Sequence, residues 1–194
     1  MIKIFILAFA LWANVAFSER NQFAEFFNSV ESLSANFSQT IYDGTTLLNR
    51  TTGNFFFQRP QQLYWHTTSP NDQVLLLNSD ALWQIDIELE QAILQQTKHL
   101  SKTPLYWLIN KPNAIKNMPK FSHQKEGVNW YVTKNAHNQP IKFGFKDGLL
   151  HIISLKNELE QTVSILFEKL HVNPNIPIQT FELNIPKGFD MIRQ

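Results

Sequence analysis

The chain has 194 residues, a length that fits one domain with a sizeable core and is short for two large domains. Hydrophobic residues make up 43% of it, aromatic residues 13% and charged residues only 17%, which excludes a disordered chain or a coiled coil. Lys and Arg number 17 against 16 Asp and Glu, so there is no excess of positive charge to grip nucleic acid. The absence of cysteine excludes disulfides, thiolate zinc sites and thiol nucleophiles.

Residues 1–18 have the pattern of a secretory signal peptide. Lys3 supplies a positive charge, and small residues stand at Ala16 and Ser18, the positions that determine cleavage. The apolar run from Ile4 to Ala13 is too short to span a bilayer, because a permanent anchor needs about 20 apolar residues. We therefore predict that residues 1–18 are removed and that residues 19–194 form one exported, soluble domain.

One amphipathic helix is expected between Arg20 and Leu33, where apolar residues recur with helical spacing. The pattern then changes to short apolar runs separated by turn dipeptides, of which Asp147-Gly148 is the clearest hairpin signal. These runs predict strands at 37–42, 53–58, 63–66, 73–78, 82–87, 92–96, 121–124, 130–133, 141–146, 149–155, 163–170 and 181–185. Ten to twelve antiparallel strands after one helix favour a large sheet curled into a barrel or sandwich.

One segment interrupts this series of strands. Thr103 is a suitable N-cap and Pro104 suits the first position of a helix, and residues 105–109 are apolar on every side. A surface helix would have a polar side, so this helix is either plugged permanently into the core or covers something apolar.

Local motifs for catalysis or metal binding are missing from the sequence. No two of the six histidines lie within four residues of each other, and no nucleophile elbow or glycine-rich phosphate loop is present. The carboxylates Asp86, Glu88 and Glu90 would share one face if they continued a strand, which leaves a secreted hydrolase open as an alternative. A solvated hairpin rim explains them better, so we predict no enzyme activity, no cofactor and no metal.

Aromatic residues are in excess of what one small core needs, since 21 remain after removal of the predicted signal. The runs Phe55-Phe56-Phe57 and Leu75-Leu76-Leu77 place apolar side chains on both faces of a strand. A single helix cannot cover so large a sheet. Either the sheet folds fully onto itself, or it leaves an apolar cavity for a ligand.

Five segments in order resemble the LolA family of periplasmic lipoprotein carriers. They include the end of the helix with its following strand, the Arg59-Pro60 turn with the tryptophan strand after it, and a Trp83 hairpin. The Thr103-Pro104 helix and a C-terminal strand at Gly188–Ile192 complete the series. The resemblance covers nearly all of the predicted mature chain.

The resemblance implies an α+β fold: an incomplete, half-open antiparallel β-barrel of about 11 strands, with a helical lid over an apolar cavity. It implies a carrier in the periplasm that shields the acyl chains of lipoproteins. The donor would be an ABC-type exporter of the inner membrane, and the recipient an acceptor on the outer membrane. We expect a monomer that binds no nucleic acid. The alternative is a relative that binds or senses another amphiphile, such as a free lipid or glycolipid.

The resemblance also implies that Arg59 holds the lid closed through hydrogen bonds, and we expect the carbonyl end of the Thr103–Ile109 helix to accept them. By strand alternation, the expected lining of the cavity is Phe55, Phe57, Trp65, Leu75, Leu77 and Trp83. The expected lid residues are Pro104, Leu105, Trp107 and Leu108. We place Leu63 and Tyr64 at the border of the opening as candidate contacts with a partner.

Overall fold

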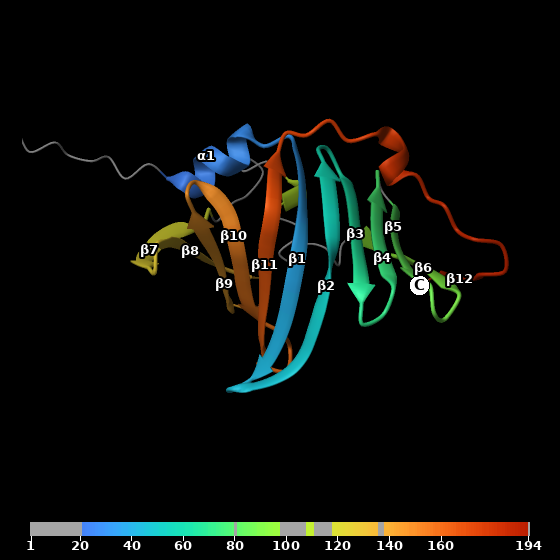
Figure 1. Ribbon diagram of the computed structural model, residues 1–194, viewed down its shortest axis with the longest axis horizontal. Coiled ribbons are helices and arrows are strands. Elements are labelled where there is room, and N and C mark those ends of the chain that lie inside the picture. Colours follow the sequence, from blue (N-terminus) through green and yellow to red (C-terminus); the bar gives the residue numbers. More distant parts are fainter. Residues whose placement is uncertain (1–20, 80, 98–107, 111–117, 136–137, 194) are drawn as a thin grey trace, which may run out of the picture.

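The computed structural model describes residues 21–79, 81–97, 108–110, 118–135 and 138–193. These residues form a 12-stranded sheet, one α-helix and a short 3-10 helix (Figure 1). The elements are α1 (Gln22–Ser29), β1 (Ser32–Asp43), β2 (Thr46–Gln58), β3 (Gln62–Ser69), β4 (Gln73–Asn78), β5 (Ala81–Asp86), β6 (Gln91–Gln95), β7 (Lys120–Lys125), β8 (Val128–Lys134), β9 (Pro140–Lys146), β10 (Leu149–Lys156), β11 (Thr162–Val172), η3 (Ile178–Phe181) and β12 (Asp190–Arg193). The predicted signal and residues 103–107 of the predicted lid lie outside the described residues.

The strands are ordered β12-β6-β5-β4-β3-β2-β1-β11-β10-β9-β8-β7, so the sheet has two separate edges and does not close into a barrel. This confirms the expected half-open antiparallel architecture, with one exception. The last strand, β12, pairs with β6 in parallel. β11 is already paired on both sides, with β1 and with β10, so the chain after it cannot add a strand beside it. Residues 173–189 therefore cross to the other edge of the sheet (Figure 1).

Most of the hairpins form at the turn dipeptides that the sequence contains. Between β9 and β10, Asp147 and Gly148 both have positive φ, 51° and 80°. This is the backbone conformation that two-residue hairpin turns require, because its twist matches that of the flanking strands. The local sequence therefore fixes the register of this hairpin.

The strand predicted at Phe181–Ile185 is wrong. Phe181 ends η3, and the residues after it are irregular until β12 begins at Asp190. The alternating apolar residues do have a packing role: Phe181 is fully buried, and Ile185 packs on the sheet. The C-terminal strand that the family resemblance implied is the one that forms.

Helix α1 begins after Asn21, whose side-chain oxygen accepts a hydrogen bond from the Ala24 N–H at 3.2 Å. Phe23 and Phe27 on its buried side have no exposed surface. The Phe23 ring meets the Phe143 ring edge-on at 5.1 Å, and the Phe26 ring meets that of Phe145 at 5.4 Å. We call the sheet face beneath α1 the inner face and the opposite one the outer face.

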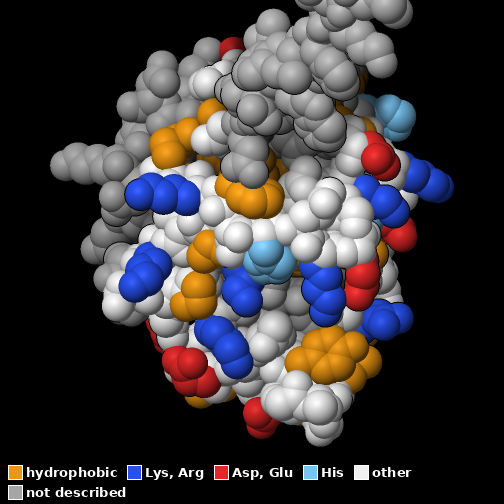
Figure 2. All heavy atoms as spheres, turned by 90° about the vertical axis from the view of Figure 1, so that its left-hand side faces the viewer, with side chains coloured by type: hydrophobic (Ala, Val, Ile, Leu, Met, Phe, Trp, Pro, Cys, Tyr) orange, Lys and Arg blue, Asp and Glu red, His pale blue; other side chains and the backbone are white. Residues whose placement is uncertain are grey.

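Charged side chains of both signs lie on one end of the molecule. Figure 2 looks at the end of the molecule where β7, β8 and β9 lie, and its basic side chains stand apart from one another, with acidic ones between some of them. No concentrated basic patch is visible on this end of the molecule.

Candidate functional site

Five of the six predicted lining residues share the inner face. Phe55 pairs with Trp65, which pairs with Leu75; Phe57 lies in register with Leu63, which lies in register with Leu77. Phe55 and Phe57 are fully buried, whereas Trp65 and Leu75 are only partly buried. The inner face of β2, β3 and β4 is therefore an apolar surface whose burial decreases away from the Phe57 row.

An aromatic cluster occupies this surface. The Trp65 ring lies 4.0 Å from the ring of Phe37 and 5.4 Å from that of Phe55, measured between centroids. The Phe37 ring can lie this close because position 53 is a glycine: a Cβ there would come within 2.9 Å of the ring and 1.9 Å of the His66 carbonyl oxygen. Gly53 is thus needed for packing, since any side chain would displace the cluster.

Trp83 is the exception, because it lies on the outer face. The tight turn between β4 and β5 pairs Leu82 with Leu77 and Trp83 with Leu76. Trp83 is 9% exposed and belongs to a second apolar cluster that contains no residue of α1. The prediction that Trp83 lines the inner face was wrong because counting by alternation across a hairpin depends on the length of the turn.

Leu63 and Tyr64 also differ from their predicted placement. Leu63 is fully buried on the inner face between Phe57 and Leu77, so it is not accessible to a partner. Tyr64 faces the other way and packs against the outer cluster. Of the predicted lid residues, Pro104, Leu105 and Trp107 lie outside the described part of the chain, whereas Leu108 is fully buried in the inner core.

Arg59 follows directly after β2 and is only 8% exposed. Its Nη1 donates to the carbonyl oxygens of Phe27, at 2.7 Å, and of Val30. Its Nη2 donates to the carbonyl oxygen of Leu108 at 3.3 Å. One guanidinium therefore connects the end of α1 with the segment at 108–110, and we call this contact the arginine bridge.

The environment of the bridge is electrostatically unusual. Burial lowers the pKa of the Arg59 guanidinium, and the carboxylate of Glu31 opposes that effect. The planar group lies 5.7 Å from the centroid of the Phe57 ring, so the cation also contacts the apolar inner face. A hollow of about 310 Å³ adjoins it, lined by Glu31, Arg59, Pro60, Gln61, Ile109 and Asn110.

Sequence reasoning missed the carbonyls of Phe27 and Val30 as partners of Arg59. Helices leave their last carbonyls unpaired, and this one ends near residue 29 rather than at Leu33. Pairing of Ser32 with Gln58 brings that end beside Arg59. Ser29 marks the earlier helix end in the sequence. Only the pairing of β1 with β2, which local sequence does not indicate, shows that this end lies beside Arg59.

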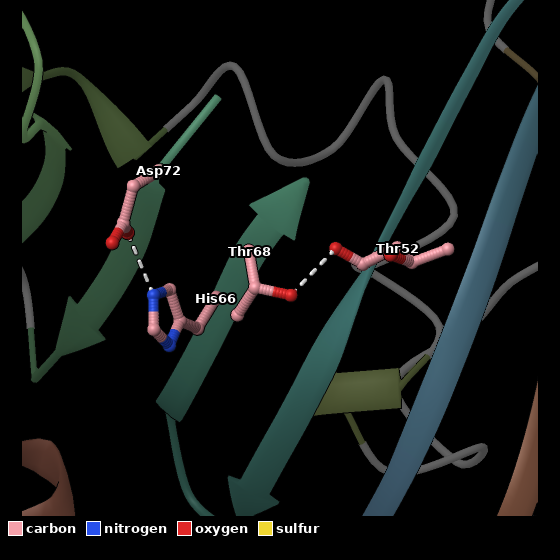
Figure 3. Close-up of polar contacts among 4 residues, drawn as sticks. All are labelled: Thr52, His66, Thr68 and Asp72. Carbon is pink, nitrogen blue, oxygen red and sulfur yellow. Dashed lines mark hydrogen bonds and ion pairs between the residues drawn. The ribbon is translucent and has the colours of Figure 1, made fainter. Parts of the chain in front are cut away.

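On the outer face, a hollow of about 510 Å³ lies between the sheet and the C-terminal segment. His66 Nε2 lies 2.8 Å from Asp72 Oδ1 at its border (Figure 3). Burial raises the pKa of the Tyr64 hydroxyl, and the Asp72 carboxylate raises it further. The Asn78 side chain donates to the Phe181 carbonyl oxygen at 2.8 Å and ties the segment to β4. No local sequence pattern indicates this hollow, because its lining residues, which range from Tyr64 to Pro186, come together only in the fold.

The acidic residues Asp86, Glu88 and Glu90 do not share a strand face. β5 ends at Asp86, and residues 87–90 form the turn before β6. Asp86 accepts hydrogen bonds from the side chain of Gln73 at 2.7 Å and from the Leu89 N–H at 3.0 Å. The hairpin interpretation is therefore confirmed. Within the described ranges, no group of three His, Asp or Glu side chains is arranged to hold a metal ion.

The part of the chain that the structure describes contains no helix long and apolar enough to cross a membrane.

Comparison with known proteins agrees with this architecture. Residues 28–184 match the family described as "Outer membrane lipoprotein carrier protein LolA". An outer-membrane lipoprotein carrier protein of Pseudomonas fluorescens is 28% identical over 204 residues, covering 100% of this chain and 99% of its own. One from Pseudomonas aeruginosa is 27% identical over 202 residues, covering 98% and 97%.

Among solved structures, an uncharacterised conserved protein from Thermus thermophilus superposes with a TM-score of 0.55 at 7% identity, covering 89% of this chain and 95% of its own. At that identity the likeness shows a shared fold alone. The family match spans most of the chain and includes Arg59 and the aromatic cluster. The chain therefore belongs to the LolA family of outer membrane lipoprotein carrier proteins.

Proposed function

We propose that this protein is a periplasmic carrier that takes lipoproteins released from the inner membrane, shields their acyl chains and passes them to an outer-membrane acceptor. The apolar inner face of β2–β4, connected through Arg59 to the segment at 108–110, is the observation that carries the proposal. Family membership and the full-length relatives support it. We infer that the donor is an ABC-type exporter and that the carrier acts as a monomer after losing residues 1–18.

The energetics require a shielded site. Withdrawing an acyl chain from lipid costs about 0.8 kcal/mol per CH₂, or roughly 12 kcal/mol for a chain of about sixteen carbons. A lipoprotein with two or three chains therefore does not leave a membrane at a useful rate by itself. A carrier that offers an apolar surface offsets most of that cost without covalent chemistry, which suits a site built from aromatic and aliphatic side chains.

The arginine bridge suggests how such a surface opens. Arg59 makes two hydrogen bonds at the end of α1, to Phe27 and to the capping residue Val30, and a single, longer one of 3.3 Å to Leu108. Hydrogen bonds weaken with length, so the contact with Leu108 is the weaker side of the bridge. We infer that loading displaces the segment at Leu108 while Arg59 stays attached to α1. The free energies of the closed empty state and the open loaded state then differ by one hydrogen bond from a charged group and by the apolar contacts that cargo replaces.

The deciding experiment uses inner-membrane vesicles that hold a fluorescently labelled, acylated lipoprotein together with its exporter and ATP. The carrier is expected to release the label into the soluble fraction as an equimolar complex. Native mass spectrometry of that complex identifies what is bound. Release that is no greater than with buffer, together with copurification of a free lipid or glycolipid, would instead establish the alternative amphiphile binder.

A further inference from the structure

The strand β2 is longer than its neighbour β3. β3 ends at Ser69, which lies opposite Thr52, and the Thr68 hydroxyl donates to the Thr52 carbonyl oxygen at 3.2 Å as a last contact (Figure 3). Residues 46–51 of β2 pair only with β1, on the side of β2 opposite to β3. Figure 1 shows the hairpin of β1 and β2 extending past the ends of the neighbouring strands. In the described parts of the chain no strand pairs with this edge of β2. Such an edge presents backbone N–H and C=O groups that can pair with an extended peptide.

A hollow of about 400 Å³ adjoins this edge. Five of its six lining residues carry amide or hydroxyl groups and none carries a charge: Asn49, Thr51, Thr67, Pro70, Asn71 and Gln73. Arg50 lies on the outer face by alternation along β2, and the two nearby carboxylates are already engaged, Asp72 with His66 Nε2 and Asp86 with the side-chain amide of Gln73. The hollow therefore suits a ligand that is uncharged and both donates and accepts hydrogen bonds.

The strand residues Thr51, Thr67 and Gln73 of this hollow lie on the same sheet face as the apolar inner residues. Thr51 shares a strand face with Gly53, Phe55 and Phe57, because side chains alternate along β2. The same order holds on the two neighbouring strands, where Thr67 follows Trp65 and Gln73 precedes Leu75. At about 3.4 Å per residue, Thr51 lies roughly 14 Å along the strand from Phe55. A ligand lying across this boundary has an apolar part on one side and a neutral polar part on the other.

We propose that the β2 edge at residues 46–51 and its hollow bind the uncharged peptide that follows the acylated residue of the cargo, as an added strand. This rests on the proposed carrier function and names a second part of the cargo that the protein recognises. Backbone pairing is independent of side-chain identity, and neutral amides and hydroxyls tolerate many uncharged sequences. The edge therefore selects cargo by chain extension and lack of charge next to the acyl chains, rather than by a defined motif.

A proximity experiment tests the placement, because the chain lacks cysteine and any engineered one is unique. Thr51→Cys introduces a thiol in the hollow, and Arg50→Cys is the control one residue away on the opposite face. The probe is a synthetic diacylated hexapeptide of serine, glycine and asparagine with one free cysteine three residues after the acylated position. Disulfide formation with Thr51→Cys is expected to exceed that with Arg50→Cys by about tenfold.

Equal yields with the two variants would overturn the proposal. So would a disulfide-linked dimer of Thr51→Cys that forms equally well with and without the peptide, because the occupant of the edge would then be a second copy of the chain. The same hexapeptide without acyl chains is expected to react slowly with both variants, since strand addition alone supplies little affinity.

A binding experiment separates this proposal from the carrier function. Thr51→Glu places a carboxylate in the neutral hollow, with Arg50→Glu as the control. Thr51→Glu is expected to weaken the lipopeptide about tenfold and to leave binding of a diacyl lipid without peptide unchanged. If the diacyl lipid binds and Thr51→Glu has no effect on the lipopeptide, the edge proposal fails and the carrier function stands. If neither ligand binds the unaltered protein, both proposals fail.

Discussion

The inner face of the sheet is buried to different degrees in its two halves. Under α1, the rings of Phe23, Phe143 and Phe145 pack at centroid distances of 5.1 and 6.1 Å and are fully buried. On β3 and β4, Trp65 and Leu75 are only partly buried. The half under α1 is fully covered, whereas on β3 and β4 the cover decreases from Leu63 and Leu77 toward Trp65 and Leu75. Under the proposed carrier function, the aromatic excess serves two purposes in one sheet, stability in the first half and acyl-chain binding in the second.

The largest effect is expected in the covered half. Phe143→Ala removes a fully buried ring from beneath α1 and should lower the free energy of unfolding by about 3–5 kcal/mol. Urea titration followed by tryptophan fluorescence measures it. Phe121→Ala, at a site 42% exposed on β7, is the control and should cost about 1 kcal/mol or less. Equal losses for the two variants would contradict the division into core and surface.

The two tryptophans on opposite faces provide a sharper comparison. Trp65→Ala should weaken binding of a diacylated lipopeptide by about tenfold, because it removes apolar contact area from the inner face. Trp83→Ala should lower the thermal midpoint while changing that affinity by less than about twofold. Titration calorimetry and thermal unfolding of both variants test this. Loss of affinity confined to Trp83→Ala would place the ligand on the outer face.

The arginine bridge should control transfer more than folding. Arg59→Leu keeps the apolar stem but lacks donors for the three carbonyls, so closing the empty carrier becomes less favourable and cargo is retained. Delivery to acceptor is expected to slow by about tenfold or more, since hydrogen bonds to charged groups contribute roughly 1.5–3 kcal/mol each. Arg59→Lys should also be slow, because an ammonium cannot span both partners as a planar fork does. Normal delivery by Arg59→Leu would exclude the bridge as the controlling contact.

The smallest effect is a pH dependence on the outer face. The pKa of Tyr64 is raised in the folded protein, so the folded state holds its proton more tightly than the unfolded state. Its contribution to stability is complete below the unfolded pKa of roughly 10 and is lost as pH rises above it. The free energy of unfolding of the unaltered protein should therefore fall more steeply above that pH than that of Tyr64→Phe. Parallel curves would show that Asp72 and burial have little effect on this hydroxyl.

Local sequence predicted the elements well and their long-range arrangement poorly. The Asp147-Gly148 turn and the apolar runs set hairpins whose partners are adjacent in the chain. Pairing of β1 with β11 joins Leu33 to Val172, and no local pattern indicates it. The segment 181–185 alternates like a strand, but the strands in the middle of the sheet are already paired on both sides and offer it no edge.

The candidate site shows the same limit. Phe55, Phe57, Trp65, Leu75 and Leu77 share one face, as strand alternation predicted, because β2, β3 and β4 keep their alternation across the turns; their role as cavity lining stays a prediction. Trp83 was misplaced because the face of β5 depends on one turn whose length the residues do not specify. The partners of Arg59 on α1 are backbone carbonyls, which carry no residue-type signal.

The parallel pairing of β12 with β6 has a consequence for how the molecule is completed. β6 is made well before β12, the strand that pairs with its other edge and the last element that the structure describes. Until the residues of β12 are made, one edge of β6 is unpaired, and strands of other chains can pair with it and form aggregates. A variant without Asp190–Arg193 would therefore leave the edge of β6 unpaired and the molecule permanently open to association there.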